Sequence, residues 1–381
     1  MQEKQRKRLL GRLKVFFKEV EVVKGVIQIH GRMDEIADDA CRLSKNTMSI
    51  PDANGLIIAV LEDQLKSTLG DISQVLQYSV TDDISEGMAE TLVAWLDDLP
   101  HDYQILVRLP VSCSASPEPY TCNNWGLVRK QFSEPGFGYW EEDSAADPRN
   151  FDFCICFPFQ GAINKYSNQI ALDEISTKVC LIIFVLRSVA HEHSDFHPKV
   201  DYSGRGWLFA EDEKGGIHKL EKLADLQDVF SEERYYATDQ ESLRKCIDTL
   251  GAIEGIPDKE RAKIANAIHW YIGSLADKSF TSSVVKLSIA LDALFGNSNQ
   301  DRGLGATIAD RVAFLHGKNM TERTEIFREV KEFYELRSKI VHGDVTVLRA
   351  KEREVCWQLQ TLLEESLLKE ISSYKTTKNQ D

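Results

Sequence analysis

The stretch Tyr334-Glu335-Leu336-Arg337-Ser338-Lys339-Ile340-Val341-His342-Gly343-Asp344 indicates how the C-terminal part of this chain folds. It closes a helix expected over about 322–341, because glycine readily takes the left-handed conformation that ends a helix, and Gly343 stands at that point. Arg337 and His342 are five residues apart. At about 100° per residue, their side chains would point about 140° apart on an unbroken helix. We therefore expect His342 on a fraying last turn, from which it can swing towards Arg337.

An arginine close to a histidine combines two chemical properties. A guanidinium can hold a phosphate, and an imidazole can move a proton near neutral pH. Together they meet the two requirements for cutting RNA without a metal ion. The alternative is that Arg337, Lys339 and His342 only complement the dipole and the unpaired carbonyls at a helix C-terminus.

The rest of the C-terminal region also has helical patterning. Apolar residues recur there at three- and four-residue spacing, which is typical of helices with one buried face. Helices are expected at about 259–275, 282–295, 306–315, 322–341 and 348–374. Gly255 and Pro257 interrupt the pattern before the first of these helices. We therefore divide the chain into domains 1–254 and 255–381.

The N-terminal domain has a mixed pattern. Residues 5 to about 99 indicate mostly helices, and Pro100 ends this region. Strands are then expected at 103–109, 151–157 and 207–210, with a turn-rich stretch at 112–150 and helices at 168–190 and 240–250. The predicted fold is mainly α, with a C-terminal helical bundle and an α+β N-terminal region that contains a small sheet.

Composition excludes several classes of protein. The 381-residue chain has a net charge of −14, which argues against a general nucleic-acid coat protein. Its longest apolar run, Val179–Leu186, is too short to span a membrane, and no secretory signal is expected at the N-terminus. The eight cysteines include no CxxC pair, which favours reduced thiols in a cytoplasm.

The charge is unevenly distributed along the chain. Residues 256–381 contain about 19 Lys and Arg against about 18 Asp and Glu, so the remainder carries about −15. Residues 1–18 are locally basic. RNA contacts are therefore expected on the C-terminal region or on this basic arm. We favour the alternative that the arm is an amphipathic helix with its leucines and phenylalanines buried.

A second segment strengthens the chemical interpretation of the motif. Asp292 stands in the mostly apolar run Val285–Gly296, where a carboxylate needs a polar partner or a cleft. This run, the helix around Arg311 and the Arg337–His342 helix together resemble the HEPN domain, most closely its Apea-like branch. The resemblance covers about residues 259–374. The branch more often has Glu where this chain has Asp292.

This resemblance implies a bundle of four or five helices that forms a homodimer through its C-terminal helices. It also implies a metal-independent endoribonuclease without a cofactor, usually within a prokaryotic toxin or antiphage defence system. Arg337 and His342 are the catalytic candidates, with Asp292, Ser338 and Lys339 in supporting roles. Lys339 could instead be an exposed partner for Glu335. A regulatory protein or a phage-derived trigger would act on the N-terminal domain. We expect that domain to sense the trigger or to restrain the nuclease.

Three alternatives remain. A non-catalytic HEPN scaffold would bind RNA or a protein without cleaving. His191, His193 and His197 could bind zinc, or they could simply be polar residues that follow the end of the buried helix at 168–190. Gly303-Leu304-Gly305 only loosely resembles a phosphate-binding turn, and no Walker-type lysine follows it.

Overall fold

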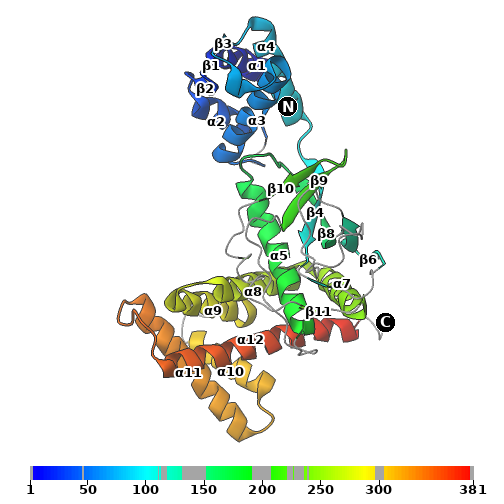
Figure 1. The fold of residues 1–381 in the computed structure, drawn as a ribbon. Helices are drawn as coiled ribbons and strands as arrows, with labels where there is room; N and C mark the ends of the chain where they lie inside the picture. Colours follow the sequence, from blue (N-terminus) through cyan, green and yellow to red (C-terminus); the bar gives the residue numbers. More distant parts are fainter. Residues whose placement is uncertain are drawn as a thin grey trace, which may run out of the picture. The chain divides into compact units, whose positions relative to one another are not determined.

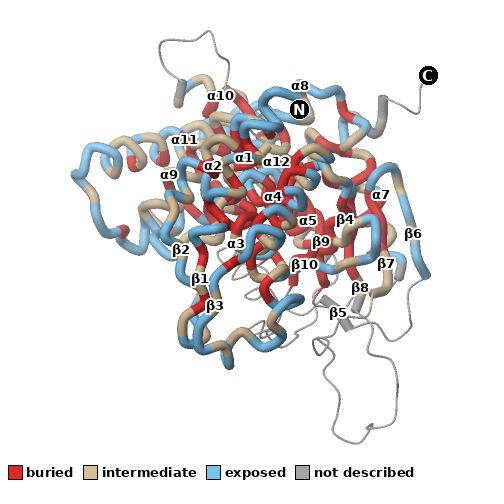
Figure 2. The backbone as a smooth tube through the Cα atoms, turned by 90° about the horizontal axis from the view of Figure 1, so that it is seen from above, coloured by how far each residue is buried: buried red, intermediate tan, exposed pale blue. Residues whose placement is uncertain are grey.

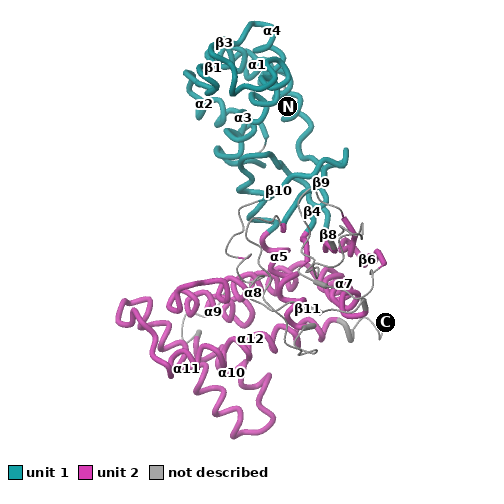
Figure 3. Tube along the Cα trace, viewed as in Figure 1, with its two compact units in different colours: residues 1–106, 157–175, 208–222 teal, residues 107–156, 176–207, 223–381 magenta. Residues whose placement is uncertain are grey.

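The computed structural model describes residues 3–44, 47–109, 111–112, 118–130, 152–190, 207–220, 226, 236–237, 240–296 and 304–377. Helices dominate these residues, as predicted, and all the described strands precede residue 238. The chain divides into two compact units (Figure 3). Unit 1 comprises Met1–Leu106, Phe157–Ile175 and Leu208–Lys222, and unit 2 comprises Val107–Cys156, Ser176–Trp207 and Leu223–Asp381.

The first hundred residues of unit 1 form a helical cluster with a small sheet. Its elements are α1 (Glu3–Lys18), β1 (Val20–Val23), β2 (Val26–Ile29), α2 (Met33–Leu43), α3 (Ile50–Leu69), the 3₁₀ turn η1 (Ile72–Gln74), β3 (Gln77–Ser79) and α4 (Asp82–Asp97). One face of each helix is buried in a shared core. Phe17 of α1, Leu61 of α3 and Leu92 of α4 are completely buried there.

The three strands of this cluster are absent from the sequence-based prediction. They pair in the order β2-β1-β3, and the β1–β2 hairpin aligns Val20 with Ile29 and Val23 with Val26. Lys24 and Gly25 form its turn with φ angles of 51° and 76°. Positive φ at both turn residues matches the right-handed twist of the flanking strands. The lysine–glycine pair between two β-branched runs is the signal that predicts this hairpin.

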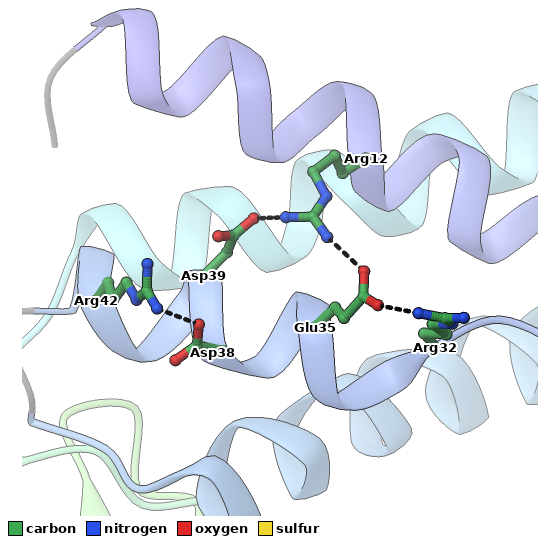
Figure 4. A network of polar contacts seen from close by, with 6 residues as sticks. All are labelled: Arg12, Arg32, Glu35, Asp38, Asp39 and Arg42. Carbon is green, nitrogen blue, oxygen red and sulfur yellow. Dashed lines mark hydrogen bonds and ion pairs between the residues drawn. The ribbon is translucent and has the colours of Figure 1, made fainter.

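Helix α1 is amphipathic, as favoured from its sequence. Leu9, Leu13, Phe16 and Phe17 are its buried residues. Most of its cations pair with carboxylates of α2 and α4. Arg12 contacts Asp39 and lies 3.4 Å from Glu35 (Figure 4). Arg6 and Lys18 pair with Asp97 and Asp82 at 2.8 and 2.6 Å. This pairing leaves α1 a weak candidate for RNA contact.

A buried carboxylate ties two distant segments of unit 1 together. Asp52, 2% exposed, forms a capping box with Ser49 at the start of α3. It also accepts hydrogen bonds from the Ser167 hydroxyl at 2.8 Å and the Gln169 N–H at 2.7 Å. Gln169 is the first residue of α5 (Gln169–Ala190), so one carboxylate serves the N-termini of two helices, where negative charge is favoured.

A second sheet has the strand order β10-β9-β4-β8-β7-β6. Its strands are β4 (His101–Arg108), β6 (Tyr120–Cys122), β7 (Trp125–Lys130), β8 (Asp152–Gly161), β9 (Leu208–Asp212) and β10 (Ile217–Lys219). The β7–β8 and β9–β10 pairs are antiparallel, and β5 (Val111–Ser112) pairs in parallel with β11 (Tyr236–Ala237). Figure 2 shows the buried positions of β4, β8 and α5 in red. The predicted strands and helix in this region are confirmed.

The C-terminal part of unit 2 is helical throughout its described residues. It contains α7 (Gln240–Glu254), α8 (Asp258–Ala276), α9 (Phe280–Phe295), α10 (Leu304–His316), α11 (Met320–Val341) and α12 (Ala350–Thr377). The five helices predicted beyond residue 258 are all present. In Figure 1 they form a bundle, in which α12 contacts each of α7 to α11. The expected boundary at 254/255 falls in the link between α7 and α8, and both helices belong to unit 2.

None of the described helices combines the length and apolarity needed to cross a membrane.

Candidate functional site

Helix α11 ends at the glycine that the sequence indicates. Gly343 has a φ of +84°, and its N–H donates to the Ile340 carbonyl at 3.0 Å. The Asp344 N–H donates to the Lys339 carbonyl at 2.8 Å. These two bonds form a Schellman motif, which satisfies carbonyls that a helix end otherwise leaves unpaired. The predicted left-handed end of this helix is therefore confirmed.

The predicted fraying of the last turn is wrong. His342 caps the helix with φ −82° and ψ −4°, and its N–H donates to the Ser338 carbonyl at 3.0 Å. The Schellman motif stabilises this turn, so the backbone of His342 stays helical. Arg337 and His342 consequently leave the helix about 140° apart. The His342 side chain is exposed, and its approach to a phosphate held by Arg337 depends on side-chain rotation or on a second chain.

Asp292 has the polar partner that its apolar surroundings require. It lies on α9, half-buried, and its Oδ1 accepts a 2.6 Å hydrogen bond from the Tyr334 hydroxyl of α11. Burial raises the pKa of the Asp292 carboxyl above its usual value, while the Tyr334 hydrogen bond and the positive charge of Arg337 act in the opposite direction. Asp292, Tyr334 and Arg337 therefore form one electrostatic group across two helices.

Arg337 supplies the positive charge of this group. The residue is half-buried, and within the described part of the chain its Nε is buried without a hydrogen-bond partner. A guanidinium presents five N–H donors in a planar fork that matches the oxygens of a phosphate. A buried donor without a partner is costly, so a ligand that supplies an acceptor gains affinity from it.

The two other supporting candidates differ in exposure. Ser338 is half-buried, and its carbonyl receives the His342 N–H described above. Lys339 and Glu335 are exposed. An exposed ammonium on this turn is available to a polyanion but takes no part in the Asp292 group.

Tyr334 is the functional candidate that sequence reasoning missed. Its position supplies a signal, since it precedes Arg337 by three residues and so shares a helix face with it. What the sequence does not give is the contact across to α9. That contact depends on how α9 and α11 pack together.

A serine–histidine–glutamate grouping elsewhere in the bundle has the distances of a catalytic triad. His316 Nε2 is 2.8 Å from Ser366 Oγ, and His316 Nδ1 is 3.2 Å from Glu365 Oε2. Ser366 is completely buried, however, and its hydroxyl donates to the Leu362 carbonyl at 2.6 Å. With its proton directed there, Ser366 accepts from His316 and is not activated by it. This grouping joins α10 to α12 and has no access to a substrate.

Nucleophilic thiols and metal clusters are also disfavoured in the described residues. Cys180 Sγ lies 3.7 Å from His269 Nδ1, but burial raises the pKa of Cys180 to about 12, so the thiolate is not populated at neutral pH. No three histidine, cysteine or acidic side chains of the described residues gather closely enough to hold a metal ion. His191, His193 and His197 lie outside those residues.

Comparison with known proteins gives no family assignment. No family model matches the sequence, and neither a curated protein nor a solved structure matches it. The HEPN resemblance therefore rests on the residues quoted above.

Proposed function

We propose that the C-terminal helices form a metal-independent endoribonuclease that acts as a homodimer in the cytoplasm. The observation that supports this most directly is the Asp292–Tyr334–Arg337 group, whose arginine lies within two helical turns of the exposed His342. An arginine whose buried Nε has no hydrogen-bond partner among the described residues offers a site for a phosphate. An exposed histidine at the C-terminal end of the same helix offers a proton carrier.

The proposed reaction is an intramolecular transesterification of RNA. The 2′-hydroxyl oxygen attacks the adjacent phosphorus, and the bond from phosphorus to the 5′-oxygen breaks. His342 takes the 2′-hydroxyl proton or protonates the leaving oxygen. Arg337 donates to the non-bridging oxygens as negative charge develops on them. The products are a 2′,3′-cyclic phosphate and a 5′-hydroxyl, and DNA, which lacks the 2′-hydroxyl, is not a substrate.

A second copy of the chain would complete the site. Because Arg337 and His342 of one chain diverge by about 140°, two-fold pairing would bring both residues to a shared groove. Residues 1–254 would restrain the nuclease or sense a trigger, such as a regulatory protein or a phage component. The near-balanced charge of the C-terminal region supports RNA binding there better than on the acidic remainder.

The deciding experiment is RNA cleavage by the purified protein with EDTA present. We expect cleavage that persists in EDTA, cyclic phosphate ends and intact DNA. His342→Ala and Arg337→Ala should each lower the rate about 10²–10⁴-fold. Lys331→Ala is the matched control, because it removes an exposed cation from the same helix without touching the Asp292 group. Cleavage abolished by EDTA and restored by Mg²⁺ contradicts the proposal, and RNA bound without cleavage favours the scaffold alternative.

A further inference from the structure

Tyr334 connects three helices of the bundle. Its hydroxyl donates to Asp292 of α9 at 2.6 Å. Its ring lies against Gly305 of α10 so closely that a Cβ at Gly305 would be 3.0 Å from Tyr334 Cγ and 3.2 Å from its Cβ. Glycine is therefore the residue that lets α10 approach this ring. Gly305 thus has a role in helix contact rather than in a phosphate-binding turn.

The Tyr334 hydroxyl has a definite effect on Asp292. Burial favours the neutral form of that carboxyl, and two groups of the described residues counteract it, the Tyr334 hydrogen bond and the Arg337 charge. Burial also raises the pKa of Tyr334 itself, so its hydroxyl remains a donor at physiological pH. Without this donor, Asp292 would be protonated more readily and would attract Arg337 less.

We propose that Tyr334 is a positioning residue which, braced by Gly305, holds the Asp292 carboxylate in the orientation that restrains the Arg337 guanidinium. Its effect on catalysis rests on the nuclease function proposed above. The proposed restraint on Arg337 does not depend on that function. The competing explanation is that the Tyr334–Asp292 bond only joins α9 to α11.

Tyr334→Phe tests the role of the hydroxyl, because it keeps the ring against Gly305. We expect kcat/KM for RNA to fall about 10- to 100-fold, as for a lost hydrogen bond to a charged group. The acidic limb of the pH profile should move to higher pH as the pKa of Asp292 rises. Adding Asp292→Asn to Tyr334→Phe should lower kcat/KM only slightly further. A lower stability with an unmoved acidic limb would establish the purely structural role and overturn the proposal.

Gly305→Ala tests the brace independently of the hydroxyl. The added methyl group should displace Tyr334 and reproduce part of the Tyr334→Phe effect. The matched control is Gly273→Ala on α8, where the nearest neighbour of a new Cβ is the Lys286 Cδ at 3.8 Å, an ordinary contact. Full activity in Gly305→Ala would contradict the brace.

The rate of Arg337 modification by a dicarbonyl reagent, followed by mass spectrometry, separates this inference from the nuclease proposal. Tyr334→Phe and Asp292→Asn should each raise that rate several-fold above wild type, whereas Lys331→Ala should leave it unchanged. This result can be obtained even if the wild-type protein cuts no RNA. Equal rates in the wild type and both variants would show that Tyr334 and Asp292 do not restrain Arg337.

Discussion

Gly343 ends α11 in a conformation that other residues adopt only with strain. Its φ is +84°, and a Cβ there would meet no atom within 4 Å, so the backbone alone disfavours substitution. Gly343→Ala should lower the free energy of unfolding by about 1 kcal/mol, and Gly343→Asn by less. Gly87→Ala, in a helix interior with open space, is the control and should be neutral or stabilising. Chemical denaturation followed by circular dichroism measures all three.

Asp52 contributes stability that depends on pH. Burial raises the pKa of its carboxyl, but hydrogen bonds from Ser49, Gln169 and Ser167 outweigh burial and lower the pKa overall. A carboxyl with a lowered folded-state pKa stabilises the fold above its unfolded value of about 3.9. That contribution is lost as pH falls through the folded-state value.

Asp52→Asn should therefore destabilise the protein by about 1–3 kcal/mol at pH 7, since a charged acceptor of buried donors is lost. The difference from wild type should shrink as pH falls below about 4. Unfolding midpoints at pH 7 and pH 3 would test this. A constant difference in stability between Asp52→Asn and the wild type across that range would mean that the charge of Asp52 contributes nothing to the stability.

At the scale of elements, long amphipathic segments were predictable and short ones were not. The five C-terminal helices show three- and four-residue periodicity over several turns, and Gly343 marks the end of α11. By contrast, β1 and β2 have four residues each, too few for alternation to stand out. β7 lies within the stretch predicted to be rich in turns. Its pairing with β8 brings together residues that are far apart in the sequence.

Some features of the candidate site were likewise predictable from the sequence, and others were not. Arg337, His342 and the need of Asp292 for a polar partner follow from residue type and spacing. The hydroxyl of Tyr334 was not predictable as that partner, because the contact joins residues 42 positions apart. The ordered turn at His342 was misjudged because the Schellman bonds stabilise a helix end that a residue pattern alone suggests is frayed.

For the whole molecule, we predict a homodimer through α9 and α11. Light scattering at micromolar concentration should give twice the chain mass of 43.2 kDa. Mixing the inactive Arg337→Ala and His342→Ala variants supplies a sharper measurement. If Arg337 of one chain works with His342 of the other, the mixture should regain part of the activity that each variant lacks.

One result would contradict the homodimer, and another would contradict a site shared between its two chains. The first is a monomer that cuts RNA as efficiently as the protein at high concentration. The second is a mixture that exchanges subunits, shown by tagging one variant, yet stays inactive. That second result would place Arg337 and His342 of a single chain in the same reaction, with His342 reaching the phosphate by side-chain rotation.

Asp52 caps the N-termini of both α3 and α5, and this has a consequence for folding during synthesis. Asp52 finds the Ser167 hydroxyl 115 residues later and the Gln169 N–H 117 residues later. During synthesis, α1 to α4 leave the ribosome well before these partners exist. The carboxylate then has only its local bonds, so the N-terminal cluster would reach its final stability after α5 has been translated. A fragment cut near residue 106 would thus resemble a nascent chain halted before its last hydrogen bonds form.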